Sequence, residues 1–76
     1  MNADKVRELI QNGIAGSTAE VIDTTGTNDH FSAVVISDSF ESLSLIEQHQ
    51  MVYNAMGGRM GNELHALALN TSAPKE

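Results

Sequence analysis

The chain has 76 residues, which is enough for one small domain with a single hydrophobic core. It carries a net charge of −6 and only four Lys and Arg residues, so it lacks the basic surface that nucleic-acid-binding proteins use to meet phosphates. Cysteine is absent, which excludes a disulfide framework, a thiolate nucleophile and an all-cysteine metal site.

The N-terminal segment predicts a helix over residues 3–15. Its apolar residues recur at helical spacing: Val6, Leu9, Ile10 and Ile14. This spacing gives one apolar stripe, which we expect to pack on a sheet.

Two β-branched stretches follow, at residues 19–25 and 31–37. Gly, Asn and Asp residues at 26–30 separate them, so we expect a β-hairpin with a turn of about five residues. Val34, Val35 and Ile36 are consecutive apolar residues in the second stretch. This run is typical of a central strand that is buried on both faces.

The second half begins with a predicted helix over residues 44–56, which two glycines end. Residues 59–64 predict at most a turn or two of further helix. Residues 65–70 alternate between alanine and leucine after His65 and predict a third strand. We expect the polar tail, residues 71–76, to fray.

The predicted order of elements is α-β-β-α-α-β, in one domain over residues 1–76. The simplest arrangement is a small α+β sandwich, in which helices cover one face of a three-stranded sheet. The last strand returns after a helical crossover and can therefore run parallel to its neighbour.

Several functional classes are disfavoured by the sequence. The N-terminus lacks the basic and long apolar regions of a signal peptide, and no run approaches the ~18 apolar residues of a membrane span. We therefore expect a soluble cytoplasmic protein with no membrane partner. No catalytic triad, carboxylate pair or phosphate-binding loop is recognisable, so we expect no enzyme.

One short motif is a candidate for nucleic-acid binding. Gly58, Arg59, Met60 and Gly61 match G-x-x-G, a loop that clamps a nucleic-acid backbone between two helices in KH domains. Only Arg59 is basic, and a turn that ends the preceding helix explains the same glycines. Both readings stay open at this stage.

Two of the three histidines, His30 and His65, border predicted strand ends. Each is explained either as a polar residue at a strand end or as an exposed metal ligand, since imidazole suits iron, zinc and copper. If the sheet brings these ends together, the two rings share one face. His49 lies within a predicted helix, where we expect a surface or boundary position.

Taken together, these residues resemble the BolA-like family. That family's pattern runs from H-F and a strand through S-x-x-F, a helix with R-H-R-x-V-Y and I-H-A-L to a T-P-x-E tail. The matching positions here are His30-Phe31, Ser37 to Phe40, His49, Val52-Tyr53 and His65-Ala66-Leu67. The resemblance implies an αββααβ fold similar to class II KH domains.

The resemblance also implies two functions. One is partnership with a monothiol glutaredoxin and glutathione, in which a [2Fe-2S] cluster is shared between the two proteins in iron-sulfur trafficking or iron and redox regulation. The family's C-terminal histidine, matched by His65, would ligate that cluster together with a ligand from the loop before the second strand. The other is DNA binding by a transcriptional regulator of stress response and cell morphology, a morphogene product.

The chain departs from the family pattern at two points that bear on function. Gln48 and Gln50 replace arginines that flank the helical histidine, which removes positive charge and disfavours DNA. The loop at residues 26–30 is also short and has no cysteine. The second cluster ligand is therefore open between His30, Asp29 and Asp23, and the partner can also hold the cluster with only His65 from this chain.

The sequence supports two further expectations about assembly. Because imidazole must be neutral to coordinate a metal, the complex should weaken below about pH 6. A weak homodimer also stays open.

Overall fold

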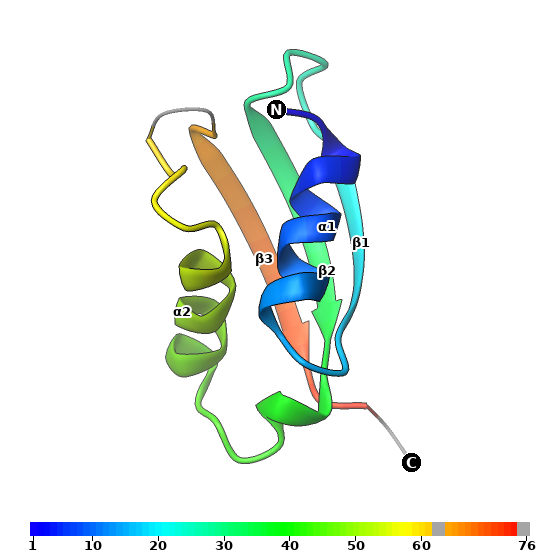
Figure 1. Ribbon diagram of the computed structural model, residues 1–76, viewed down its shortest axis with the longest axis vertical. Coiled ribbons are helices and arrows are strands. Elements are labelled where there is room, and N and C mark those ends of the chain that lie inside the picture. Colours follow the sequence, from blue (N-terminus) through cyan, green and yellow to red (C-terminus); the bar gives the residue numbers. More distant parts are fainter. Residues whose placement is uncertain (62–63, 75–76) are drawn as a thin grey trace.

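The computed structural model describes residues 1–61 and 64–74. Its elements in chain order are helix α1 (Ala3–Gly13), strands β1 (Thr18–Asp23) and β2 (His30–Ile36), the short 3-10 helix η1 (Asp38–Phe40), helix α2 (Leu45–Ala55) and strand β3 (Ala66–Ser72). Figure 1 shows the strands side by side, with α1 in front of β1 and β2 and with α2 to the left of β3. No described helix has the length and apolar composition needed to cross a membrane.

The three strands form one mixed sheet in the order β1-β2-β3. β1 and β2 are antiparallel and joined by the expected hairpin, with Val21 opposite Ala33. β3 runs parallel to β2, with His30 beside Ala66 and Ile36 beside Ser72. The connection between these parallel strands contains α2, as a crossover requires.

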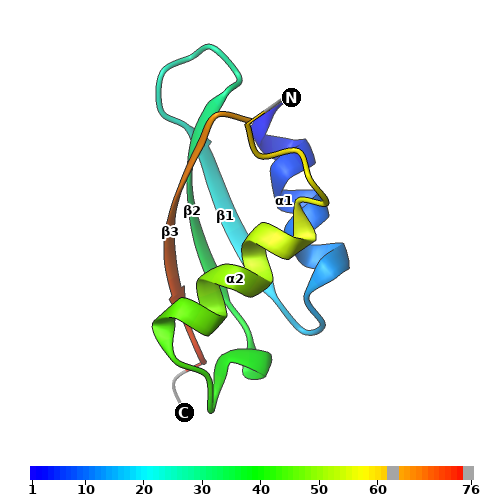
Figure 2. The same ribbon diagram turned by 90° about the vertical axis from the view of Figure 1, so that its left-hand side faces the viewer.

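Both helices cover the same face of the sheet, as Figure 2 shows edge-on. The predicted α+β class with helices on one face is therefore confirmed. The expectation that β2 is buried on both faces is wrong, because Val34 and Ile36 lie on the uncovered face and are exposed. Phe31, Ala33 and Val35 alternate with them and form the core side of the strand.

Helix α1 is capped at its N-terminus by Asn2, whose Oδ1 accepts a hydrogen bond from the Lys5 backbone N–H at 2.8 Å. Its stripe of Val6 and Ile10 is buried. The helix ends at Gly13, where it crosses α2 at close range. A Cβ on Gly13 would lie 2.7 Å from Cβ of Ala55, which is nearer than two carbons can approach without a shift of one helix.

Replacing Gly13 with alanine is therefore expected to lower the free energy of unfolding by about 1–2 kcal/mol, because overpacking outweighs alanine's better helix propensity. Urea unfolding followed by circular dichroism measures this change. In an Ala55→Gly background the same substitution should cost less, since the contacting methyl is gone. An equal cost in both backgrounds would contradict the steric explanation.

Helix α2 begins with a capping box, in which Ser44 and Glu47 exchange side-chain to backbone hydrogen bonds. Its core side carries Gln48 and Val52, and the C-cap residue Met56 is also buried, whereas Leu45 and Ile46 are exposed. The buried Gln48 is satisfied, because its Nε2 donates to the Leu43 carbonyl at 3.0 Å and its Oε1 accepts from Thr71 at 2.7 Å.

Two expectations for the second half are corrected. Residues 59–61 and 64 form turns and a single bridge between Met60 and Leu64 in place of a second helix, and residues 62 and 63 lie outside the described residues. Positive φ angles at Gly58 and Gly61 favour a turn at this point. The tail does not fray from residue 71, because Thr71 and Ser72 complete β3 and Thr71 is buried against Gln48.

Candidate functional site

The site lies where β2 and β3 both begin, at the same end of the sheet. Parallel pairing places His30 beside Ala66, so His65, one residue earlier, lies next to His30. The backbone N–H groups of His65 and Ala66 both donate to the Asp29 carbonyl, at 2.8 and 3.2 Å. The two strand ends that the sequence could not place relative to each other are therefore adjacent.

The two imidazoles face one another. Their ring centroids are 6.0 Å apart, and the ring planes meet at 65°. The side chains of His30 and His65 are 43% and 55% exposed, so both can be reached by another molecule. The backbone of each is fixed by the sheet or by Asp29, which makes them exposed groups on a rigid frame.

The Asp29 carboxylate joins the two histidines. Its Oδ1 lies 2.9 Å from Nδ1 of His30, and its Oδ2 lies 3.1 Å from Nδ1 of His65. The Thr27 hydroxyl also donates to Oδ1. Among the described residues no partner engages the Nε2 atom of either ring.

These hydrogen bonds lower the pKa of Asp29 well below its usual range, first through the Thr27 hydroxyl and then through His30. Because the pKa of Asp29 is lower in the folded state than in the unfolded state, ionisation of this carboxyl stabilises the fold. The resulting stabilisation is complete above about pH 4, where an unfolded aspartate is also ionised, and is lost only as the pH falls through the lower folded value. Asp29 therefore stays a carboxylate throughout the pH range in which histidines titrate.

Asp23, the other acidic residue of the hairpin, has a different role. Partial desolvation opposes its ionisation, but backbone N–H groups of Asn28, Gly26 and Thr25 donate to it and lower its pKa overall. Its two oxygens accept these bonds at 2.9 to 3.2 Å. Asp23 thus closes the hairpin loop through its own backbone N–H groups.

The donor set here suits a shared metal centre better than a metal site built by the chain alone. No three His, Cys, Asp or Glu side chains within residues 1–61 and 64–74 are arranged to hold a metal ion. Two neighbouring imidazoles with a carboxylate behind them can still supply one or two nitrogen ligands. The remaining ligands must then come from another molecule.

The alternative nucleic-acid motif has a different environment. Nη1 of Arg59 donates to the Met56 carbonyl at 2.8 Å, so the one cation of the motif is bound to its own helix end. Met60 is partly buried against the core, and the N–H of Gly61 donates to the Leu64 carbonyl at 2.7 Å. The loop closes on itself, and it does not lead directly into a second helix at residues 59–61.

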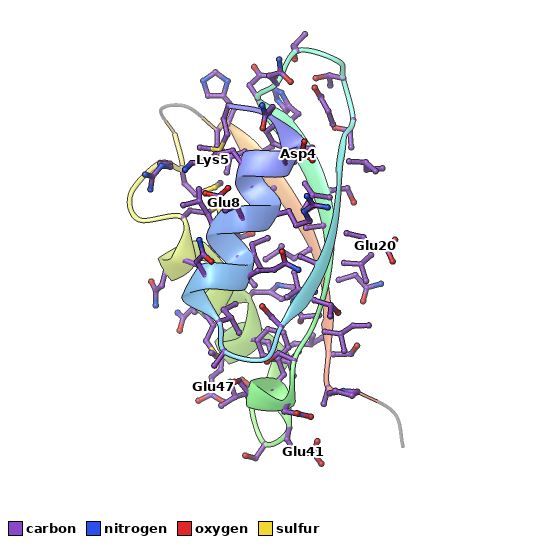
Figure 3. All side chains as sticks on the ribbon, turned by 45° about the vertical axis from the view of Figure 1, so that its right-hand side comes forward. Asp4, Lys5, Glu8, Glu20, Glu41 and Glu47 are labelled. Carbon is purple, nitrogen blue, oxygen red and sulfur yellow. The ribbon has the colours of Figure 1, made fainter. Side chains whose placement is uncertain are left out.

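Acidic side chains are spread over the whole molecule. Figure 3 shows Asp4 and Glu8 on α1, Glu20 on β1, and Glu41 and Glu47 at the opposite end from Asp4. Gln48, at a position where the family has arginine, is buried. The described surface therefore offers no continuous basic face for a phosphate backbone.

Asp29 is the residue whose role the sequence did not reveal. It was expected only as an alternative ligand, whereas its carboxylate lies behind both imidazoles. Its position immediately before His30 was a usable signal, but its contact with His65 depends on pairing between segments 36 residues apart.

Comparison with known proteins identifies the family. The family model described as BolA-like protein matches residues 10–76. The DNA-binding transcriptional regulator BolA of Escherichia coli is 28% identical over 83 residues, an alignment that covers all of this chain and 79% of that protein.

Solved structures agree with this match. A bolA protein homologue from Coxiella burnetii superposes with a TM-score of 0.80 at 35% identity, covering 97% of this chain and 92% of that one. The BolA domain of SufE1 from Arabidopsis thaliana has a TM-score of 0.81 at 26% identity, covering 95% and 91% of the two chains. The matched residues include the whole sheet and both strand-end histidines, and the chain belongs to the BolA-like family.

Proposed function

We propose that this chain is the partner of a monothiol glutaredoxin and supplies His65 and His30 as ligands to a [2Fe-2S] cluster shared between the two proteins, in iron-sulfur trafficking or iron and redox regulation. The observation that carries the proposal is the pair of exposed imidazoles at the strand ends, each with Nδ1 on the Asp29 carboxylate. A carboxylate behind the ring is the usual arrangement of a metal-ligating histidine.

The partner's chemistry follows from what this chain lacks. Iron-sulfur clusters are held mainly by thiolates, and histidine replaces cysteine on one iron in some centres. A chain without cysteine can complete a cluster that a thiolate-bearing protein presents. The glutaredoxin cysteine and glutathione would supply the sulfur ligands, and this chain would supply nitrogen. It needs no catalytic residue for this role.

The test is a titration of the chain into a monothiol glutaredoxin loaded with its cluster and glutathione. Size-exclusion chromatography measures complex formation, and visible absorption with circular dichroism reports the ligand set of the cluster. A one-to-one complex with an altered visible spectrum is the expected result. The same titration with cluster-free glutaredoxin should give much weaker binding. Equal binding in both arms would indicate a protein-surface adaptor and contradict cluster sharing.

A second candidate function, DNA binding, is favoured by one observation, the similarity to the DNA-binding transcriptional regulator BolA of Escherichia coli. The acidic surface and the engaged Arg59 weigh against it for this chain. We expect no measurable affinity for duplex DNA at 150 mM salt, and at 50 mM salt only weak binding that is lost on adding salt. Fluorescence anisotropy across this range makes the measurement. Tight, sequence-selective binding at 150 mM salt would favour the regulator over the cluster partner.

A further inference from the structure

The contacts of Asp29 carry an inference that rests on the proposed function and deepens it. Both carboxylate oxygens are already occupied: Oδ1 by the Thr27 hydroxyl and Nδ1 of His30, and Oδ2 by Nδ1 of His65. Asp29 is therefore a poor candidate for the second ligand. Asp23 is equally engaged by backbone N–H groups of its own loop, which leaves His30.

We propose that Asp29 is a positioning residue that sets the tautomer of both histidines, so that His30 and His65 present their Nε2 lone pairs together as a two-nitrogen unit. An ionised carboxylate has no proton to give and can only accept hydrogen bonds. Each Nδ1 within reach of Asp29 must therefore carry the proton. In a neutral imidazole the other nitrogen, Nε2, then carries the lone pair that a metal binds.

The backbone of Asp29 supports the same arrangement. Its carbonyl accepts the N–H groups of both His65 and Ala66, so main chain and side chain together hold the start of β3 against the end of the hairpin. The Asp29 side chain is partly enclosed, with 29% of it exposed. One residue thus fixes both the position and the protonation pattern of ligands from two separate strands.

The test begins with the free chain. Long-range ¹H–¹⁵N spectra at pH 8.5 distinguish the two neutral tautomers of each histidine. In the wild type, His30 and His65 should both carry the proton on Nδ1. His49, which no described carboxylate contacts, serves as the internal reference. A proton on Nε2 of either His30 or His65 in the wild type would overturn the inference.

The decisive variant is Asp29→Asn, because an amide keeps one acceptor oxygen and turns the other into a donor. At least one of the two histidines should then move its proton to Nε2. The matched control is Asp23→Asn, which alters the same loop and should leave both tautomers unchanged. If the tautomers respond equally to both substitutions, Asp29 acts only by ordering the loop and the inference fails.

A second arm measures the complex. Asp29→Asn should weaken binding to cluster-loaded monothiol glutaredoxin by about 10- to 100-fold, as the loss of a carboxylate behind a metal-bound histidine commonly does. If the wild-type tautomers are as expected but the wild-type chain does not bind glutaredoxin, the proposed function is wrong, while the role of Asp29 is still supported. If the wild-type chain forms the complex and Asp29→Asn binds with the same affinity, the inference about Asp29 is wrong and the proposed function is not affected.

Discussion

Replacing His65 with alanine is expected to abolish the cluster-bridged complex, with affinity for cluster-loaded glutaredoxin falling by about 100-fold or more. Loss of a group behind a metal ligand already costs about 10- to 100-fold, so loss of the ligand should cost at least as much. The fold should be unaffected, because this side chain is exposed and its ring contacts only Asp29 and His30 among the described residues. Isothermal titration and visible circular dichroism measure the two effects.

The chain offers a matched control for this substitution. His49→Ala removes the same side chain from α2, away from the strand ends, and should leave both the affinity and the cluster spectrum unchanged. His30→Ala should lie between the two, since it removes one nitrogen and leaves His65 on Asp29. Retention of the cluster spectrum in His65→Ala would contradict the role assigned to this histidine.

Replacing Phe31 with alanine is expected to have the largest effect on stability. The side chain is 1% exposed and belongs to the central strand, between Asp23 on β1 and Leu67 on β3. Removing a buried phenylalanine costs about 3–5 kcal/mol, while a chain of this length has a total stability of roughly 4–11 kcal/mol. The variant should therefore lose about a quarter or more of the total stability, and at the lower end of this range it would be unfolded at 25 °C.

Thermal and urea unfolding followed by far-ultraviolet circular dichroism measure this loss. At roughly 4–8 °C per kcal/mol, the midpoint should fall by more than about 12 °C. Ile46→Ala is the control, because that side chain is 73% exposed and should change stability by less than about 0.5 kcal/mol. A cost below about 1 kcal/mol for Phe31→Ala would mean that the core near His30 is not packed as described.

The exposed apolar residues of α2 show where periodicity alone misleads. The sequence places Leu45, Ile46 and Val52 in one helix as apolar residues, yet only Val52 reaches the core. The polar residue Gln48 is buried instead of Leu45 and Ile46, and its Oε1 accepts a hydrogen bond from the Thr71 hydroxyl. Side-chain spacing predicts that a helix forms, but the packing of α2 against the rest of the protein decides which residues it buries.

The loop after α2 shows that glycines alone do not define the structure of a turn. Residues 57–61 are compatible with a helix end and also match a nucleic-acid clamp, since glycine suits both conformations, and the sequence favours the helix end. In the structure this turn is held by the hydrogen bond from Arg59 to Met56 and by the bridge between Met60 and Leu64. These contacts depend on how the loop folds back, which no local pattern encodes.

The sequence by itself determined the α+β class, the hairpin, the helix boundaries at Gly13 and Ala55 to within a few residues, and the resemblance to the BolA-like family. These features follow from local periodicity, turn residues and motif order, which are properties of neighbouring positions. The tertiary structure alone decided that His30 and His65 meet across one carboxylate. That contact exists because parallel pairing in a fixed register brings together residues 35 positions apart, and register is set by the packing of the whole sheet.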